Sequence, residues 1–255
     1  MVRIYALSCG AMEFDRRAFF PDDPGGARLR IPVPAFLVVH PKGRVLFDTG
    51  IHADTLRDPV ARLGERTGRF FQMYCGATEG VVNQLALLGW RADSVTHVIN
   101  SHFHFDHCGC NASFPQATIL VQRAEMLAAR APQSAYSGRD WDRPLNYELV
   151  DGEHDLFGDA SVLLMPTPGH TQGHQSLCVN AGPGLRFCLC ADACYTQRHL
   201  EESLLPAAGA IWNAAEMSRT LEMLRGLRER KGMQLIFGHD GGQWASLPVA
   251  PDPLA

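Results

Sequence analysis

The sequence lacks the features that would place the protein in a membrane or on a nucleic acid. Residues 1–8 have neither the long apolar core nor the small-residue cleavage site of a secretory signal. No apolar run approaches the length that spans a bilayer. No basic stripe marks a nucleic-acid surface, and no acidic block marks a disordered tail. We therefore expect a cytoplasmic protein that binds neither membranes nor nucleic acids.

Internal repeats, low-complexity tracts and Pro/Ser-rich linkers are also missing, so we expect a single domain over residues 1–255. The eight cysteines do not predict disulfides, because large cytosolic domains rarely use them. The pairs 108/110 and 188/190 are C-x-C, whereas zinc knuckles usually carry C-x-x-C. We expect these side chains to fill buried space.

The periodicity of apolar residues predicts strands in both halves of the chain, each half with helices of its own. Such a pattern favours two sheets packed face to face, with helices outside. The first helix is expected to start at Thr78, a good N-cap, and to end at Gly89. Residues 132–146 are interpreted as a surface loop near the mouth of a site. The other expected elements are strands at 2–8, 35–39, 45–47, 96–100, 161–165, 175–179, 185–190 and 235–237, and helices near 121–130 and 214–230.

The strongest chemical signal is H-x-H-x-D-H at residues 102–107, directly after a predicted buried strand. Strand-end loops are held by the scaffold yet open to solvent, so ligands placed there can converge. Imidazole nitrogens and carboxylate oxygens suit zinc and similar ions. Three histidines and an aspartate crowded into a purely structural turn would gain no packing.

Three further strand ends carry the same residue types. G-H-T-x-G-H follows one predicted strand at 169–174, Asp192 follows another, and His239-Asp240 follows the last. Together with residues 102–107, four strand ends each offer a ligand. This is the arrangement that a metal centre at the edge of two sheets requires.

The order of these motifs, with D-T-G at 48–50 before them, resembles the metallo-β-lactamase superfamily from Asp48 to His239. Within the superfamily the sequence is most similar to the N-acyl homoserine lactonases, which quench quorum-sensing signals. Tyr195, three residues after Asp192, is the most telling feature of that narrower likeness. The resemblance implies an α/β fold, the αβ/βα four-layer sandwich of two packed mixed sheets with helices on the outer faces.

The resemblance also implies two divalent metal ions, with zinc expected and iron, cobalt and manganese as alternatives. A hydroxide bridging the two metals would attack the lactone carbonyl, because bound water can ionise near pH ~7. The implied ligands are His102, His104 and His170 for one metal and Asp106, His107 and His239 for the second, with Asp192 bridging both.

Asp106 and Tyr195 are the expected catalytic side chains. Asp106 would carry a proton to the leaving group, and Tyr195 would hydrogen-bond the substrate carbonyl. Phe105 either seals the core or meets the acyl chain of the substrate, and we include it with Tyr195 as substrate-binding. Aromatic residues in loop-like segments at 19–20 and 70–74 suggest an apolar groove.

Asp48 is expected to support a ligand histidine or its loop, and His174 to hydrogen-bond at a strand start and not to bind metal. Asp240 is expected to cap or to support the neighbouring ligand. The remaining histidines, which have no matching partners, are expected to be ordinary: His40, His52, His97, His154 and His199.

Other functions remain as alternatives at this stage. A thioesterase resembling glyoxalase II, or another ester or lactone hydrolase, would keep the same metal site. Diiron oxidoreductases of the superfamily usually carry Glu at the position of His104 and a flavin domain, and neither is present. A mononuclear-iron sulfur dioxygenase would not need the second ligand set. RNase Z-like processing is disfavoured by the acidic balance, and a closed structural zinc site would normally use cysteines. The sequence leaves open whether the chain forms a homodimer.

Overall fold

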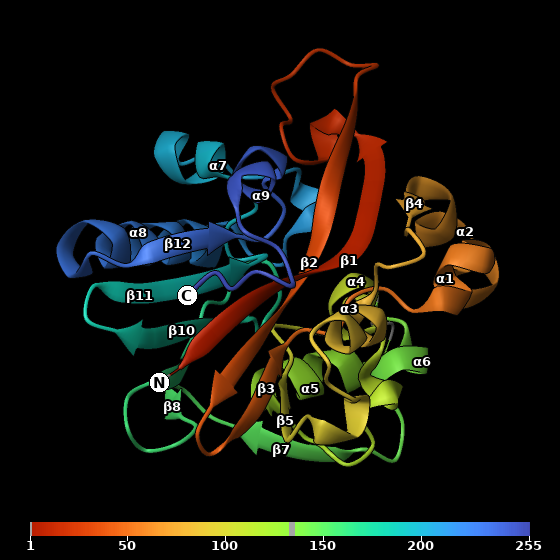
Figure 1. Ribbon diagram of the computed structural model, residues 1–255. Coiled ribbons are helices and arrows are strands. Elements are labelled where there is room, and N and C mark those ends of the chain that lie inside the picture. The colour runs from red at the N-terminus through yellow and green to blue at the C-terminus, as the bar shows by residue number, and fades with distance from the viewer. Residues whose placement is uncertain (1, 133–135) are drawn as a thin grey trace.

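Two mixed β-sheets lie face to face in the centre of the molecule, and helices cover their outer sides (Figure 1). The computed structural model describes residues 2–132 and 136–255. Every predicted strand overlaps an observed one, and residues 2, 96, 100 and 161 of the predicted strands lie just outside the observed bounds. Part of the predicted loop, residues 133–135, lies outside the described residues.

The larger sheet has seven strands among the described residues, and its first part is antiparallel. Strand β1 pairs with both β4 and β2, and β2 pairs with β3. From β3 onward the neighbours are parallel, so β5, β6 and β7 all run toward one edge. In spatial order the strands are β4 (Gln72–Tyr74), β1 (Arg3–Asp15), β2 (Arg28–His40), β3 (Gly43–Phe47), β5 (His97–Ile99), β6 (Thr118–Gln122) and β7 (Asn146–Val150).

The smaller sheet has five strands among the described residues, and only its β11–β12 pair is parallel. The other neighbours are antiparallel, and a tight hairpin joins β10 to β11. The spatial order is β12 (Gln234–Phe237), β11 (Leu185–Ala191), β10 (Gln175–Gly182), β9 (Val162–Pro166) and β8 (His154–Asp155).

Successive side chains of each strand point to opposite faces of the sheet, so separate cores form on the two faces. Ile4 and Ala6 of β1 pack into the core between the sheets, with Leu177 and Val179 of β10. Tyr5 and Leu7 of β1 belong instead to the core under the outer helices. Because side chains alternate with a period of two, one strand serves both layers. The resulting helix–sheet–sheet–helix layering confirms the predicted four-layer fold.

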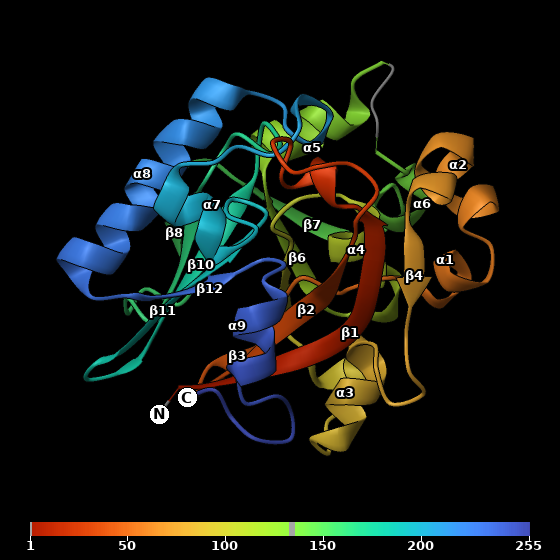
Figure 2. The same ribbon diagram turned by 90° about the horizontal axis from the view of Figure 1, so that it is seen from above.

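Helix α8 (Ala214–Lys231) covers the outer face of the smaller sheet (Figure 2). Its Leu221 and Leu224 pack on Cys178 and Cys188 of that sheet. Asn213 caps the helix by accepting from the backbone N–H of Glu216. The remaining α-helices are α1 (Ala53–Arg57), α2 (Pro59–Phe70), α3 (Val81–Leu87), α4 (Phe105–Cys108), α5 (Arg123–Arg130), α6 (Gly138–Trp141), α7 (Gln197–Glu202) and α9 (Gly241–Ser246). Short 3-10 helices are η1 (Arg16–Ala18), η2 (Ala92–Ser94), η3 (Asn111–Ser113) and η4 (Ala208–Ala210).

Two sequence expectations about helices were wrong. Helix α3 is not the first helix, and Gly80 is its N-cap in place of Thr78. The Glu79 carboxylate closes the turn before it by accepting from the Gly76 N–H, and it also accepts from Ser8 Oγ, so the chain enters the helix two residues later than expected. The earlier helix α2 has little helical signal because Gly64, at φ 81°, interrupts it.

The segment 132–146, expected to be a loop, contains the short helix α6. Trp141 of α6 is buried, so part of this segment belongs to the protein interior. Among the described residues, no helix is both long and apolar enough to cross a membrane.

Candidate metal centre

The larger sheet delivers four of the predicted ligands from one strand end. Strand β5 ends at Ile99, His102 and His104 follow in the loop, and α4 then carries Asp106 and His107. His104 is the N-cap residue of this single-turn helix. The tight turn therefore brings both ends of the H-x-H-x-D-H motif to the same edge of the sheet.

The smaller sheet delivers the other three ligands, each after a different strand. His170 follows β9, Asp192 follows β11, and His239 follows β12. A Cβ on Gly238 would lie 2.4 Å from the Ala191 carbonyl oxygen. Only glycine allows β11 and β12 to approach so closely, which places Asp192 and His239 together.

Three imidazoles form the first of two side-chain clusters. The Nε2 atoms of His102 and His170 are 3.1 Å apart, and His104 Nδ1 lies 3.0 and 2.9 Å from them. A tetrahedral ion with nitrogen ligands at about 2.1 Å separates them by about 3.4 Å, so this triangle is close to the size of a metal site. The two clusters are His102, His104, His170 and Asp192, and Asp106, His107 and His239.

The Asp192 carboxylate lies between the two clusters. Its Oδ2 is 3.3 Å from His170 Nε2. Its Oδ1 is 3.1 Å from His107 Nε2 and 3.0 Å from His239 Nε2. Each cluster therefore faces a different oxygen of one carboxylate, as a bridging ligand requires.

The donor atoms fit bound cations better than they fit one another. His107 Nε2 and Asp192 Oδ1 are buried and only 3.1 Å apart, yet neither atom makes a well-aligned hydrogen bond to any described residue. Buried polar atoms without partners are costly unless something else satisfies them. This observation and the two donor sets support a pair of divalent ions at this site.

Burial and crowding also keep the first cluster ready to donate lone pairs. Burial and the neighbouring imidazoles hold the pKa of His102 well below its usual range. Burial and His170 lower the pKa of His104 to about 3. At His107 burial acts in the same direction, but carboxylates led by Asp192 raise its pKa well above the usual range. The three imidazoles of the first cluster are therefore neutral, whereas the carboxylates around His107 favour its protonated form.

Asp48 supports the second cluster, as predicted. Its Oδ2 lies 2.8 Å from His107 Nδ1 and fixes the ring so that Nε2 faces Asp192. It also accepts from the backbone N–H and the hydroxyl of Ser101, both at 2.7 Å. One carboxylate thus holds both a ligand and the start of the ligand loop.

His174 lies outside both clusters and makes hydrogen bonds, as predicted. Its Nε2 accepts from the backbone N–H of Asp192 at 3.1 Å, and its Nδ1 lies 2.8 Å from Thr167 Oγ1. Asp240 caps α9 by accepting from the Gln243 N–H, which confirms its expected capping role.

The Tyr195 hydroxyl lies on the outer side of the first cluster. It is 2.8 Å from His170 Nδ1 and donates to the Ala210 carbonyl oxygen at 3.2 Å. Burial, together with Asp192 and Asp106, raises the pKa of Tyr195 well above its usual range, so the phenol keeps its proton. A neutral phenol beside this cluster is a hydrogen-bond donor.

Aromatic rings form a row from one ligand segment to the other. Phe105 lies 5.5 Å from Phe71, which lies 5.5 Å from Phe14. Phe14 lies 5.0 Å from Phe19, and Phe19 stacks on Tyr195. We call these five residues the aromatic row. Four of them are buried in the core under the outer helices, and Phe71 packs against that core. Phe103 is fully buried in a separate core, where it stacks on Trp141.

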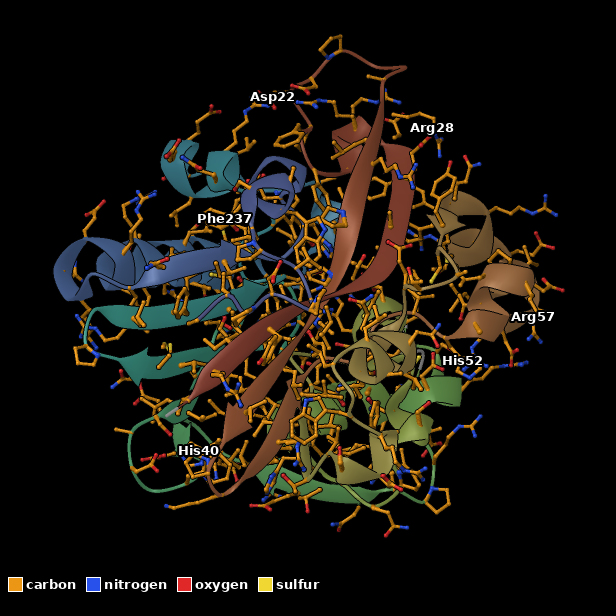
Figure 3. The ribbon with its side chains drawn as sticks, in the orientation of Figure 1. Asp22, Arg28, His40, His52, Arg57 and Phe237 are labelled. Carbon is orange, nitrogen blue, oxygen red and sulfur yellow. The ribbon has the colours of Figure 1, made fainter. Side chains whose placement is uncertain are left out.

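The structure places the remaining histidines apart from the clusters and gives several of them ordinary partners. Figure 3 shows His40 and His52 near the edges of the molecule. His40 lies 3.2 Å from an Asp159 oxygen, and His52 caps α1. His199 lies 2.9 Å from the Phe19 carbonyl oxygen.

The cysteines are free thiols, and most of them are buried. Cys188, Cys190 and Cys194 are fully buried and pack together under α8, which confirms that they fill space. Burial raises the pKa of Cys110 to about 12 and holds that of Cys108 well above its usual range. Such thiols are poor nucleophiles.

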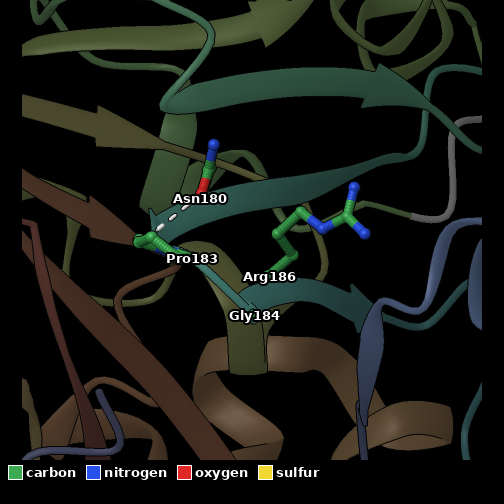
Figure 4. A pocket seen from close by; sticks show the side chains of 5 residues that line it. Asn180, Pro183, Gly184 and Arg186 are labelled. Atoms are coloured by element: carbon green, nitrogen blue, oxygen red, sulfur yellow. Dashed lines mark hydrogen bonds between the residues drawn. The ribbon is translucent and has the colours of Figure 1, made fainter.

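A surface hollow at the β10–β11 hairpin is unrelated to this centre (Figure 4). It lies at the end of the two strands opposite to His174 and Asp192. Asn180 accepts from the Gly182 N–H within the turn, and the Arg186 guanidinium donates to the Lys231 carbonyl. Both of these side chains therefore already have a partner within the protein.

Sequence reasoning missed some groups that hold the ligands. The backbone carbonyls of Ala210 and Pro32 lie 2.9 and 2.8 Å from the Nδ1 atoms of His170 and His239. Every residue has a carbonyl oxygen, so no residue type could have marked these two. Glu125, a buried carboxylate near both ligand loops, was missed as well.

A model of the metallo-beta-lactamase superfamily matches residues 29–239. The chain belongs to this superfamily, as its motif order predicted. Within it the chain is similar to lactonases. The N-acyl homoserine lactonase AttM of Azorhizobium caulinodans is 35% identical, covering 98% of this chain and 97% of its own. The N-acyl homoserine lactonase AiiA of Bacillus thuringiensis subsp. kurstaki is 30% identical, covering 98% of each.

Solved structures show the same likeness. An N-acyl homoserine lactone hydrolase with the product N-hexanoyl-L-homoserine bound at its catalytic metal centre superposes with a TM-score of 0.89. It is 27% identical, and the match covers 98% of both chains.

Proposed function

We propose that this protein hydrolyses the lactone ring of N-acyl homoserine lactones and so inactivates quorum-sensing signals. The observation that carries the proposal is the Tyr195 hydroxyl, 2.8 Å from His170 Nδ1 beside a centre of two ligand clusters. When a lactone binds, this hydroxyl would turn its proton from the Ala210 carbonyl to the lactone carbonyl oxygen. The likeness to lactonases over 98% of the chain supports the same substrate class.

Zinc is the ion we propose for both positions, because imidazole and carboxylate ligands suit it. Two such ions supply Lewis-acid chemistry, since they acidify water and polarise a carbonyl oxygen. The residues that would hold them are His102, His104 and His170 on one side and Asp106, His107 and His239 on the other, with Asp192 between.

Asp106 is the proposed proton carrier. Burial would raise its pKa, but the imidazoles of His107 and His239 lower it, so the carboxylate is ionised. An ionised carboxylate can accept the proton that water loses during attack. It can then return that proton to the alkoxide released when the ring C–O bond breaks.

The aromatic row is the proposed binding site of the acyl chain. Phe105 directly precedes Asp106, and Tyr195 lies at the other end of the row. A lactone ring held at the clusters would therefore leave its acyl chain against apolar rings. Burying methylenes there would stabilise the complex by up to ~0.8 kcal/mol each.

The test is a pH-indicator assay of ring opening on short- and long-chain N-acyl homoserine lactones, with metal content measured on the same sample. We expect the rate of acid release to rise with the amount of bound metal. Fully active protein should hold about two metal equivalents per chain. Rapid hydrolysis of thioesters with no lactone opening would replace the proposal by the thioesterase alternative. Elemental analysis also distinguishes zinc from iron, cobalt and manganese.

A further inference from the structure

Glu125 of helix α5 is a fully buried carboxylate that touches both ligand loops. Its Oε1 accepts from the backbone N–H of Phe103 at 3.0 Å, between His102 and His104. Its Oε2 accepts from Thr171 Oγ1 at 2.7 Å, beside His170. One side chain therefore joins the histidine loop of the larger sheet to that of the smaller sheet.

The packing around Glu125 shows that the contact is close. Its Oε2 also accepts from the Gly173 N–H at 3.1 Å, and a Cβ on Gly173 would lie 2.0 Å from the Glu125 backbone nitrogen. The Tyr136 side chain adds a further hydrogen bond, and its ring lies 5.2 Å from the His104 ring. No described Lys, Arg or His forms an ion pair with this carboxylate, so hydrogen bonds to the two loops are its main stabilisation.

We propose that Glu125 is a positioning residue that sets the spacing of His102, His104 and His170 and thereby the metal affinity of the first cluster. It touches none of these imidazoles and acts through the backbone of their loops. The second cluster is held by Asp48 and the Pro32 carbonyl, so it does not depend on Glu125. The inference rests on the metal centre of the proposed function but not on its substrate.

The nearly isosteric change Glu125→Gln tests this role. An amide nitrogen must replace one oxygen, so it faces the N–H of Phe103 or that of Gly173 without an acceptor. Losing such a supporting partner typically lowers metal affinity roughly 10- to 100-fold. Zinc affinity is measured by competition with a chelator in two backgrounds. His239→Ala impairs the second cluster, and His170→Ala impairs the first.

We expect Glu125→Gln to weaken zinc binding roughly 10- to 100-fold in the His239→Ala background and to leave it unchanged in the His170→Ala background. The matched control is Met126→Ala, the next residue on α5, which is buried but lies outside these hydrogen bonds. It should lower stability without changing zinc affinity. Equal losses in both backgrounds, or the same loss in Met126→Ala, would reduce Glu125 to a residue of general stability.

Amide hydrogen exchange on metal-free protein gives a second readout. We expect faster exchange in Glu125→Gln than in the wild type at whichever of Phe103 and Gly173 faces the new amide nitrogen, and unchanged exchange at Ser101, whose N–H is held by Asp48. This measurement separates the inference from the proposed function, because it needs neither metal nor substrate. Unaltered exchange at both amides would overturn the proposal.

Discussion

Phe19 lies flat on Tyr195, with ring centroids 4.2 Å apart and planes only 4° from parallel. The phenylalanine comes from the long connection between β1 and β2, and the tyrosine follows β11, so the stack joins two distant segments. It fixes the plane of the phenol, and the Ala210 carbonyl fixes the hydroxyl. The phenol ring is therefore held in place, and only its hydroxyl proton must turn from Ala210 to a substrate oxygen.

The first prediction follows from this donor. Tyr195→Phe keeps the ring and removes only the hydroxyl, so the metal content should not change. Turnover of a homoserine lactone should fall roughly 10- to 100-fold, because the developing charge on the carbonyl oxygen loses one hydrogen bond. The measurement is turnover normalised to bound metal.

A second tyrosine provides the control for this prediction. The Tyr147 hydroxyl donates to the Trp141 carbonyl, away from the clusters, so Tyr147→Phe should retain normal turnover. Normal turnover in Tyr195→Phe as well would make Tyr195 a packing residue.

The second prediction concerns the carboxylate between the clusters. Asp192→Ala leaves two cations facing each other with no charge between them, so metal and activity should disappear together. Elemental analysis and the lactone assay on one preparation check this. The control is Asp159→Ala, because Asp159 is a more exposed carboxylate beside His40. This variant should keep both its metal and its activity. A variant at 192 that retains two metals and near-normal turnover would exclude the bridging role.

The third prediction concerns the aromatic row. Specificity constants should rise with acyl length by up to about fourfold per methylene, the equivalent of ~0.8 kcal/mol. Phe105→Ala should flatten this dependence, because it shortens the row beside Asp106. Leu127→Ala, at an exposed position of α5, should leave it unchanged. If the specificity constants of the wild type do not vary with acyl-chain length, the aromatic row is not part of the binding site.

The fourth prediction concerns stability against pH. His199 is buried, lies 2.9 Å from the Phe19 carbonyl oxygen and contacts Thr196 Oγ1 at 2.8 Å. Burial lowers the pKa of His199 from 6.5 to about 4. As the pH falls, the unfolded chain therefore binds a proton at a higher pH than the folded chain does. Stability is lost as the pH falls from about 6.5 to about 4.

Between about pH 7 and pH 5, the free energy of unfolding should therefore fall by about 2 kcal/mol less in His199→Gln than in the wild type. Glutamine can still donate to the Phe19 carbonyl but takes up no proton. Urea unfolding of metal-free wild type and variant at both pH values measures the difference. Parallel pH dependences in the two proteins would show that His199 does not contribute.

The residues of the two clusters could be predicted from the sequence because the chemistry expected of them depends on side-chain type. His102, His107 and Asp192 belong to short motifs at strand ends, and strand ends were predictable from apolar alternation. Their support was harder to predict. Pro32 and Ala210 contribute only backbone carbonyls, and Glu125 is one acidic residue among many until the fold buries it.

The helices before β4 show a second limit of sequence reasoning. Helix α2 begins with Pro59, and Gly64 interrupts it at φ 81°. Glycine has weak helix propensity and proline is tolerated only in the first turn, so local preference did not indicate a helix. Packing of Phe70 and Phe71 on Phe14 is a tertiary contact that no local pattern records.

The donors of the centre are spread over both sheets, and the last of them, His239, follows the last strand. During synthesis on the ribosome, the histidines of the first motif emerge long before β11 and β12 exist. A nascent chain can therefore hold an ion only loosely until the two sheets have docked. An ion would therefore meet the full donor set only after the two sheets have docked, so its capture would be a late step of folding.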